Sequence, residues 1–179
     1  MLTFLVGGAR SGKSTLAVQM AEHHGGAVHF LATAEPFDDD LRARIARHRA
    51  ERPTGWSTGE VPLELPDAIV AAPTDAFLIV DCLTVWLGNL TVHTESPFEL
   101  ANHIDDLSSA LRQRAHSTDV PTVVVSNEVG MGIHPDSELG RQYRDDLGRL
   151  NQQVAAVADR TLLLVAGRAI RLDNPWELL

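Results

Sequence analysis

One glycine-rich octapeptide near the start of the chain limits the possible folds more than any other stretch. Residues 7–14 read GGARSGKS and fit the phosphate-binding loop pattern G-x-x-x-x-G-K-[ST]. The apolar run from Leu2 to Val6 before it is typical of a buried strand, and Ser14 to His24 after it is typical of a helix. This order of strand, loop and helix argues against a chance glycine-rich turn and predicts a nucleotide-binding α/β fold.

The loop residues have separate expected roles. Glycines let the backbone wrap closely around an anion, and the loop N–H groups with the helix N-terminus then hold phosphates. Lys13, the only lysine in the chain, is expected to reach the β- and γ-phosphates. The Ser14 hydroxyl is expected to ligate Mg²⁺.

A second candidate for the cation site lies further along the chain. The apolar strand pattern of Phe77 to Val80 ends in Asp81, which is the Walker B arrangement of a strand followed by a carboxylate. Many α/β strands end in Asp, so the pattern gains weight only from the phosphate-binding loop beside it. We expect Ser14 and Asp81 to share the Mg²⁺ shell, and Cys82 to be a small buried residue.

An arginine-rich segment stands out in a chain with a formal net charge of -9. A helix is expected from Asp38 to about Glu51, and Leu41, Ile45 and His48 fall on one of its faces at i, i+4 and i+7. The flanking arginines are Arg42, Arg44, Arg47, Arg49 and Arg52. One interpretation is a solvated basic helix with an inward histidine. The other is a polyphosphate clamp with an imidazole aimed into it, because guanidinium groups bind phosphate in a bidentate manner.

Composition limits the class of protein. A length of 179 residues with 44% hydrophobic residues suits a single α/β domain over 1–179, with 173–179 as a tail. The acidic balance argues against nucleic-acid binding, and the lone cysteine excludes an internal disulfide and a Cys-rich metal site. No signal peptide and no membrane-spanning apolar run is recognisable, which favours a cytoplasmic protein.

The remaining pattern alternates strands and helices, which predicts a doubly wound, mostly parallel sheet. Further strands are expected at Val28–Ala32, Ser57–Val61, Thr122–Ser126, Thr161–Val165 and, as an edge strand, Ala169–Leu172. Further helices are expected at Leu63–Ala72, from Thr84 to Leu90, from Pro97 to His116 and from Asp136 or Ser137 to Ala158. Ligands bind at the carboxyl ends of such strands, so Asn127 and Glu128 are site candidates, with a turn role as the alternative.

Four blocks of the sequence resemble the bifunctional adenosylcobinamide kinase / adenosylcobinamide-phosphate guanylyltransferase family of cobalamin biosynthesis. They are GGARSGKS at 7–14, ATA at 32–34 with DDDLRARIARHRAERP at 38–53, VDCLTVWLGNL at 80–90, and SNEVGMGIHP at 126–135 with RDDLGRLNQ at 144–152. The first block alone is generic, whereas the other three together are specific.

The resemblance implies a RecA-like P-loop fold in three layers, a propeller-shaped homotrimer and two reactions. ATP or GTP would phosphorylate adenosylcobinamide, and GTP would then donate GMP to the new phosphate through a guanylyl-histidine. That histidine would be His48, with Lys13 as the other catalytic residue. The implied GTP contacts are Gly7, Gly8, Ala9, Arg10, Ser11, Gly12, Lys13, Ser14, Ala32, Thr33, Ala34, Arg49, Ala50, Glu51, Arg52, Glu60 and Asp81. Two alternatives stay open: a P-loop small-molecule kinase with one activity, and a nucleotide switch without catalysis.

Overall fold

A seven-stranded sheet organises the computed structural model, which describes residues 1–35, 49, 53–94 and 96–178. Its strand order is β3-β2-β4-β5-β1-β6-β7. The strands are β1 Leu2–Gly7, β2 Val28–Ala32, β3 Ser57–Glu60, β4 Phe77–Asp81, β5 Thr122–Val125, β6 Arg160–Val165 and β7 Arg168–Leu172. Neighbouring strands run parallel except for β6 and β7, which are antiparallel. The expected mostly parallel α/β sheet is therefore confirmed.

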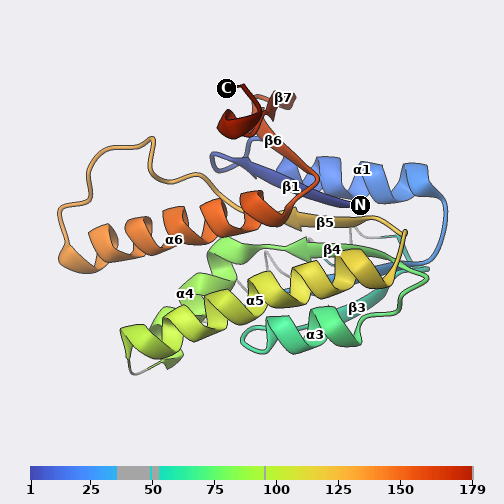
Figure 1. Cartoon of the computed structure of the whole chain (residues 1–179), viewed down its shortest axis with the longest axis horizontal. Helices are drawn as coiled ribbons and strands as arrows, with labels where there is room; N and C mark the ends of the chain where they lie inside the picture. Colours follow the sequence, from blue (N-terminus) through green and yellow to red (C-terminus); the bar gives the residue numbers. More distant parts are fainter. Residues whose placement is uncertain (36–48, 50–52, 95, 179) are drawn as a thin grey trace.

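Helices cover both faces of this sheet. Within the described residues they are α1 Lys13–His24, α3 Leu65–Ala71, α4 Leu83–His93, α5 Pro97–Ser117 and α6 Glu138–Val157. Figure 1 shows α1 on one face and the other four on the opposite face, so the molecule has three layers. In one hydrophobic core, α1 packs against strand residues such as Phe30 and Ile79. In the larger core, the other four helices pack against strand residues such as Phe4 and Val80.

Strand β1 lies in the middle of the sheet and is buried along its whole length. Strand β5 separates it from β4, the strand that ends in Asp81. The register pairs Val125 with Leu5 on one side and with Asp81 on the other. The C-terminal ends of β1, β5 and β4 therefore meet at one edge of the sheet, which we call the carboxyl edge.

Local signals in the sequence explain where the helices begin and end. Helix α1 ends at Gly25, which is left-handed (φ 73°) and donates its N–H to Ala21 O at 3.3 Å. Helix α5 begins after Ser96, whose side chain accepts the Glu99 N–H, and has Pro97 in its first turn. Helix α6 begins after Ser137, whose side chain accepts the Gly140 N–H, so a serine caps each of the two long helices.

The expected elements agree with the described ones within a few residues. The edge strand is confirmed as β7, and the expected tail after it contains a short 3₁₀ helix, Pro175–Leu178. The expected helix from Asp38 to Glu51 lies outside the described residues apart from Arg49. Among the helices that the structure describes, none has the length and apolar character needed to cross a bilayer.

Candidate active site

The loop between β1 and α1 has the backbone of a phosphate cradle. Gly7, Arg10 and Gly12 all have positive φ, at 153°, 58° and 100°. A Cβ atom on Gly7 would lie 2.3 Å from Leu164 O of β6, so only glycine fits there without a backbone shift. The exposed Gly8, Ala9 and Arg10 form the outer part of the loop, and the confirmed strand, loop and helix bear out the first sequence prediction.

Lys13 is buried and reaches back into this loop. Its Nζ donates to Gly7 O at 2.9 Å, to Gly8 O at 2.7 Å and to Ser11 Oγ at 3.4 Å. Burial lowers the pKa of Lys13, and the negative charges of Cys82 and Asp81 act in the opposite direction. The only ammonium side chain of the protein therefore lies inside the phosphate cradle and within electrostatic reach of the β4 carboxylate.

The ends of β2 and β4 are tied to each other at the carboxyl edge. Ala32 pairs with Asp81 in the parallel register. Thr33 Oγ1 donates to Cys82 O at 2.7 Å and accepts the Cys82 N–H at 2.9 Å. Thr33 O accepts a bond of 2.8 Å from Asn89 Nδ2 of α4, which also donates to Pro62 O. Two of the expected nucleotide-contacting segments, 32–34 and Asp81, thus lie beside each other.

Glu60, another expected contact with GTP, is the last residue of β3. Val61 N donates to Ala32 O at 2.7 Å, so the end of β3 is fixed beside the end of β2. Glu60 Oε1 forms an ion pair of 2.7 Å with Arg49 Nη1, and both side chains are exposed. His48 and the expected contacts Ala50, Glu51 and Arg52 lie outside the described residues.

The segment after β5 is fixed by side chains that the sequence did not single out. Asn127 N donates to Thr84 Oγ1 at 2.7 Å, and Asn127 O accepts from Asn151 Nδ2 at 2.9 Å. Glu128 Oε1 accepts the Gly130 N–H at 2.6 Å, which is the turn role left open above. Thr84 and Asn151 belong to α4 and α6, and their separation from Asn127 along the chain explains why spacing gave no signal for them.

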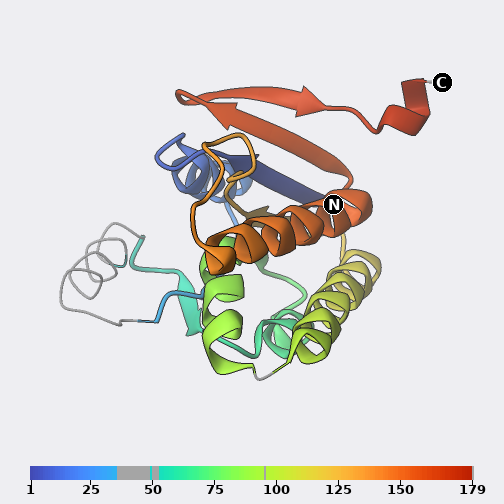
Figure 2. The ribbon, with the colours of Figure 1, turned by 90° about the vertical axis from the view of Figure 1, so that its left-hand side faces the viewer.

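The β6–β7 hairpin completes the surroundings of the loop. Gly167 N in the hairpin turn donates to Ser11 O at 2.9 Å, and a Cβ atom on Gly12 would lie 3.3 Å from Gly167 Cα. Figure 2 shows this hairpin as two long strands at the margin of the sheet, on the side of β1 away from α3 and α5. The hairpin therefore contacts the phosphate cradle and also forms one edge of the sheet.

The donor set at this edge suits Mg²⁺. Ser14 offers a hydroxyl in the first turn of α1, and Asp81 offers a carboxylate at the end of β4. Mg²⁺ binds through one or two such oxygens and completes its shell with phosphate oxygens and water. Within the described residues no group of three or more His, Cys, Asp or Glu could hold a metal ion by itself.

A separate groove lies between α5 and α6, away from the phosphate cradle. Its volume is about 510 Å³, and Leu100, Ile104, Asp146 and Arg149 are among the residues that line it. None of the expected nucleotide contacts lines this groove.

A buried lysine in a β1–α1 phosphate cradle, with a carboxylate at the end of a parallel strand, defines the class of P-loop nucleotide-binding proteins. The fold agrees with two solved RecA-like proteins. A RadB recombinase gives a TM-score of 0.51 at 16% identity, covering 90% of this chain and 73% of that one. The flagellar accessory protein FlaH of Methanocaldococcus jannaschii gives 0.50 at 12% identity, covering 96% and 77%.

The family follows from the sequence comparison. Residues 3–172 match the family described as "Cobinamide kinase / cobinamide phosphate guanyltransferase", and the chain belongs to that family. The bifunctional adenosylcobalamin biosynthesis protein CobP of Pseudomonas aeruginosa is 40% identical over 97% of this chain and 98% of that protein. CobU of Salmonella typhimurium is 38% identical over 96% and 99%. The chain is therefore a bifunctional enzyme, a cobinamide kinase and a cobinamide phosphate guanylyltransferase, as the resemblance implied.

Proposed function

We propose that both reactions use nucleotide held by residues 7–14. In the kinase step the aminopropanol hydroxyl oxygen of adenosylcobinamide bonds to the γ-phosphorus of ATP or GTP and releases its proton to water. The bond from that phosphorus to the β–γ bridging oxygen breaks, and ADP or GDP leaves. Such a transfer needs positioning and charge stabilisation more than covalent help. One observation carries this proposal: Lys13 Nζ lies 2.9 Å and 2.7 Å from the Gly7 and Gly8 carbonyl oxygens, inside the cradle.

The proposed cation site consists of Ser14 and Asp81. Mg²⁺ bound there would supply positive charge to the phosphate oxygens during transfer. The chain itself contributes the Ser14 hydroxyl, the Asp81 carboxylate and the ammonium group of Lys13. The sheet register supports this grouping, because it brings the C-terminal ends of β1 and β4 to the same edge of the sheet.

For guanylyl transfer we propose His48 as the nucleophile. A neutral imidazole nitrogen bonds to the α-phosphorus of GTP, the bond from that phosphorus to the α–β bridging oxygen breaks, and pyrophosphate leaves. A phosphate oxygen of adenosylcobinamide phosphate then bonds to the same phosphorus, the phosphorus–nitrogen bond breaks, and adenosylcobinamide-GDP is released. The arginines around His48 in the sequence favour the neutral imidazole and stabilise phosphate charge.

The further GTP contacts that we propose are Ala32, Thr33, Ala34, Arg49, Ala50, Glu51, Arg52 and Glu60. The ties from β2 to β4 and from β2 to β3 support this set, because they bring Ala34, Asp81 and Glu60 to the same edge as the phosphate cradle. The 2.7 Å pair between Arg49 and Glu60 supports it further, since it brings two of the proposed contacts together.

Labelling with GTP tests the assignment. The purified protein is incubated with Mg²⁺ and GTP labelled at the α-phosphate, and acid-labile label on the protein is measured. We expect label on the wild type, none on His48→Ala, and at least a hundredfold less on Lys13→Ala. In the presence of adenosylcobinamide, mass analysis should detect the phosphate and then the GDP product. Turnover to the phosphate without any label would instead support the alternative, a small-molecule kinase with a single activity.

We also propose that the chain acts as one P-loop domain, assembles as a homotrimer and works in the cytoplasm. Nearly full-length coverage of the CobP and CobU relatives supports one functional unit. Sedimentation equilibrium at several protein concentrations tests the trimer, and a constant monomer mass would exclude it.

A further inference from the structure

The loop from Ser126 to Ser137, which we call the β5–α6 loop, begins at the phosphate cradle. Glu128 N donates to Gly7 O, the last residue of β1, at 3.0 Å. From there the chain passes through Gly130 and Gly132 and returns to the start of α6. Figure 1 shows this loop extending well beyond the end of the sheet on the side of the P-loop. The loop therefore leaves the sheet directly beside the phosphate-binding residues 7–14.

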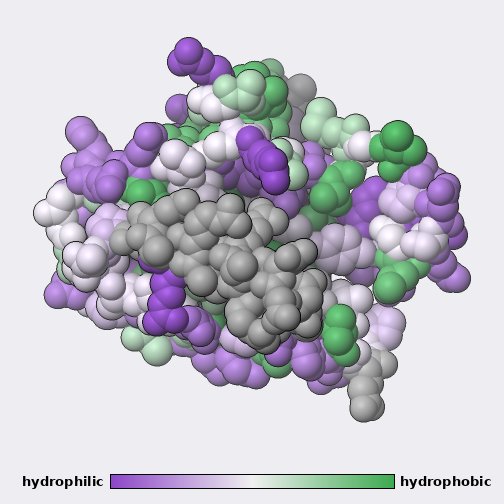
Figure 3. Space-filling view, turned by 180° about the vertical axis from the view of Figure 1, so that it is seen from behind, coloured by the Kyte–Doolittle hydropathy of each residue, from purple (hydrophilic) through white to green (hydrophobic). Residues whose placement is uncertain are grey.

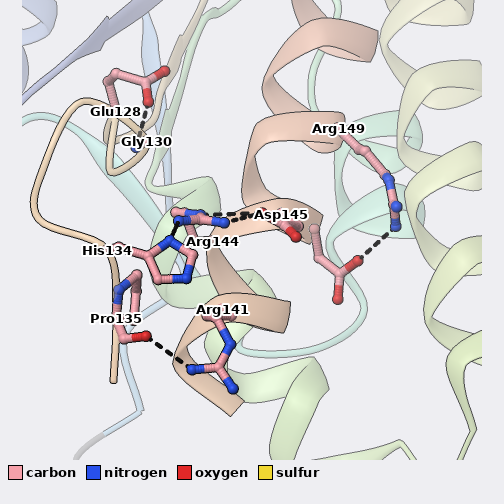
Figure 4. Close-up of polar contacts among 9 residues, drawn as sticks. Glu128, Gly130, His134, Pro135, Arg141, Arg144, Asp145 and Arg149 are labelled. Carbon is pink, nitrogen blue, oxygen red and sulfur yellow. Dashed lines mark hydrogen bonds and ion pairs between the residues drawn. The ribbon is translucent and has the colours of Figure 1, made fainter. Parts of the chain in front are cut away.

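Two arginines of α6 hold the far half of the loop in shape. Arg141 Nη1 donates to Pro135 O at 3.0 Å and to Asp136 O at 2.7 Å. Arg144 Nη1 lies 2.7 Å from His134 Nδ1 and donates to it, so this ring nitrogen is the acceptor. Figure 4 shows these contacts on one side of the loop, with the Glu128–Gly130 bond at its start. These hydrogen bonds hold the loop in a defined conformation.

The same loop presents large apolar side chains to solvent. Met131 is 80% exposed, Ile133 is 97% exposed, and Leu139 in the first turn of α6 is 63% exposed. Single exposed apolar residues need no explanation, but here two lie on the β5–α6 loop and a third lies in the adjoining first turn of α6, all within nine residues. Seen from behind in Figure 3, hydrophobic residues stand out at the end of the molecule where this loop lies.

We propose that the β5–α6 loop is the docking surface for the corrin ring of adenosylcobinamide. This inference rests on the proposed function and names where its second substrate binds. The acceptor hydroxyl must reach the γ-phosphate, so the ring must lie beyond the outer end of the nucleotide, and the loop starts there. A corrin ring is a broad macrocycle with methyl groups and peripheral amides. Met131 and Ile133 offer apolar contact to its faces, and methionine adapts well to an irregular surface.

Steady-state kinetics of the full chain tests the docking surface. The variants are Met131→Ser, Ile133→Ser and the double variant, with Val70→Ser as the matched control, since Val70 is also exposed (47%) but belongs to α3. We expect the KM for adenosylcobinamide to rise at least tenfold in the double variant. The KM for GTP and the guanylyl label formed without corrinoid should stay within about twofold, because neither uses this surface. Val70→Ser should match the wild type throughout.

A second variant tests the brace. Arg144→Gln removes the charged donor to His134 without touching the apolar side chains, and we expect a smaller rise in the same KM with kcat unchanged. An unchanged corrinoid KM in the double variant overturns the docking surface while leaving the enzyme assignment intact. A lower sedimentation mass of the double variant with an unchanged KM also overturns it, because the surface then belongs to a second copy of the chain. A wild type that fails to phosphorylate adenosylcobinamide would instead remove the proposed function itself.

Discussion

Thr33 and Cys82 exchange two hydrogen bonds through a single hydroxyl group. Thr33 Oγ1 donates to Cys82 O at 2.7 Å and accepts from Cys82 N at 2.9 Å, and Thr33 is fully buried. The hydroxyl therefore ties the end of β2 to the residue that follows Asp81. Thr33, one of the proposed GTP contacts, therefore also fixes the ends of β2 and β4 relative to each other.

Replacement of Thr33 by valine keeps the shape of the side chain but removes this tie. The Cys82 N–H would lose its acceptor, which costs about 1–3 kcal/mol for a buried group. We expect Thr33→Val to lower the free energy of unfolding by roughly 2 kcal/mol and to weaken GTP binding, and Thr33→Ser to retain most of both. Urea unfolding and a GTP titration measure the two effects. Wild-type stability in Thr33→Val would show that the tie contributes nothing.

Gly7 is the position of the phosphate cradle that tolerates a side chain least. Its φ is 153°, and an added Cβ would lie 2.3 Å from Leu164 O, a backbone atom of the neighbouring strand. We expect Gly7→Ala to destabilise the fold by about 3 kcal/mol or more, because β1 and β6 must separate to admit the methyl group. Gly8→Ala is the control for stability, since a Cβ there meets nothing within 4 Å. Equal urea midpoints for the two variants would contradict the close approach of the strands.

The sequence predicted the phosphate cradle correctly because all its parts are local. The strand before the loop, the loop itself and the helix after it all lie within the first 24 residues. Each can be recognised from its local pattern of apolar residues and glycines. The order of strands in the sheet could not be predicted in the same way, because it depends on which strands pair over long distances. That β5 lies between β1 and β4 became known only from the structure.

The long-range hydrogen bonds that position the site residues also could not be predicted from the sequence. Asn89 was part of a motif block, but its bonds to Thr33 O and Pro62 O join residues 56 and 27 positions away. The same holds for Thr84 and Asn151, which hold Asn127 from two helices. The sequence alone does not show that an asparagine side chain bridges two distant segments, because asparagine is also common in turns. The role becomes clear once its buried hydrogen-bond acceptors are known.

The ion pair between Arg49 and Glu60 allows the proposed GTP contacts to be tested separately from stability. Both side chains are more than half exposed, at 65% and 59%. An exposed pair contributes at most about 1 kcal/mol, so Arg49→Ala and Glu60→Ala should unfold at nearly the wild-type urea concentration. If both residues contact GTP, each variant should bind GTP at least about tenfold more weakly. Arg168→Ala, which changes an exposed arginine of β7, is the matched control.

Exchanging the charges of Arg49 and Glu60 distinguishes two direct contacts with GTP from an ion pair that does not contact the nucleotide. If Arg49 and Glu60 only neutralise each other, the exchanged variant Arg49→Glu with Glu60→Arg should bind GTP as the wild type does. If each contacts the nucleotide, the exchange should bind no better than the single variants. Isothermal titration with GTP gives the answer, and wild-type affinity in the exchanged variant would remove both residues from the proposed site.

Cys82 gives the fold a pH dependence whose sign follows from its burial. Cys82 is half-buried, whereas the sequence favoured a fully buried residue, and the loss of solvent around its thiol raises the pKa from its ordinary value of 9.0 to about 11. The Asp81 charge acts in the same direction. Between these values the unfolded chain loses the thiol proton while the folded chain keeps it. The unfolded state then binds fewer protons, so the free energy of unfolding falls as the pH rises from about 9 to 11.

The expected fall is on the order of 2 kcal/mol, and Cys82→Ala should remove it. Burial also raises the pKa of Tyr143 to about 12, which adds a fall of the same sign at higher pH in both proteins. Urea unfolding of the wild type and Cys82→Ala at intervals from pH 8 to 10.5 therefore isolates the thiol as the difference in slope. Parallel slopes would mean that the thiol ionises as easily in the folded chain as in the unfolded one, and that Cys82 is open to water beside Asp81.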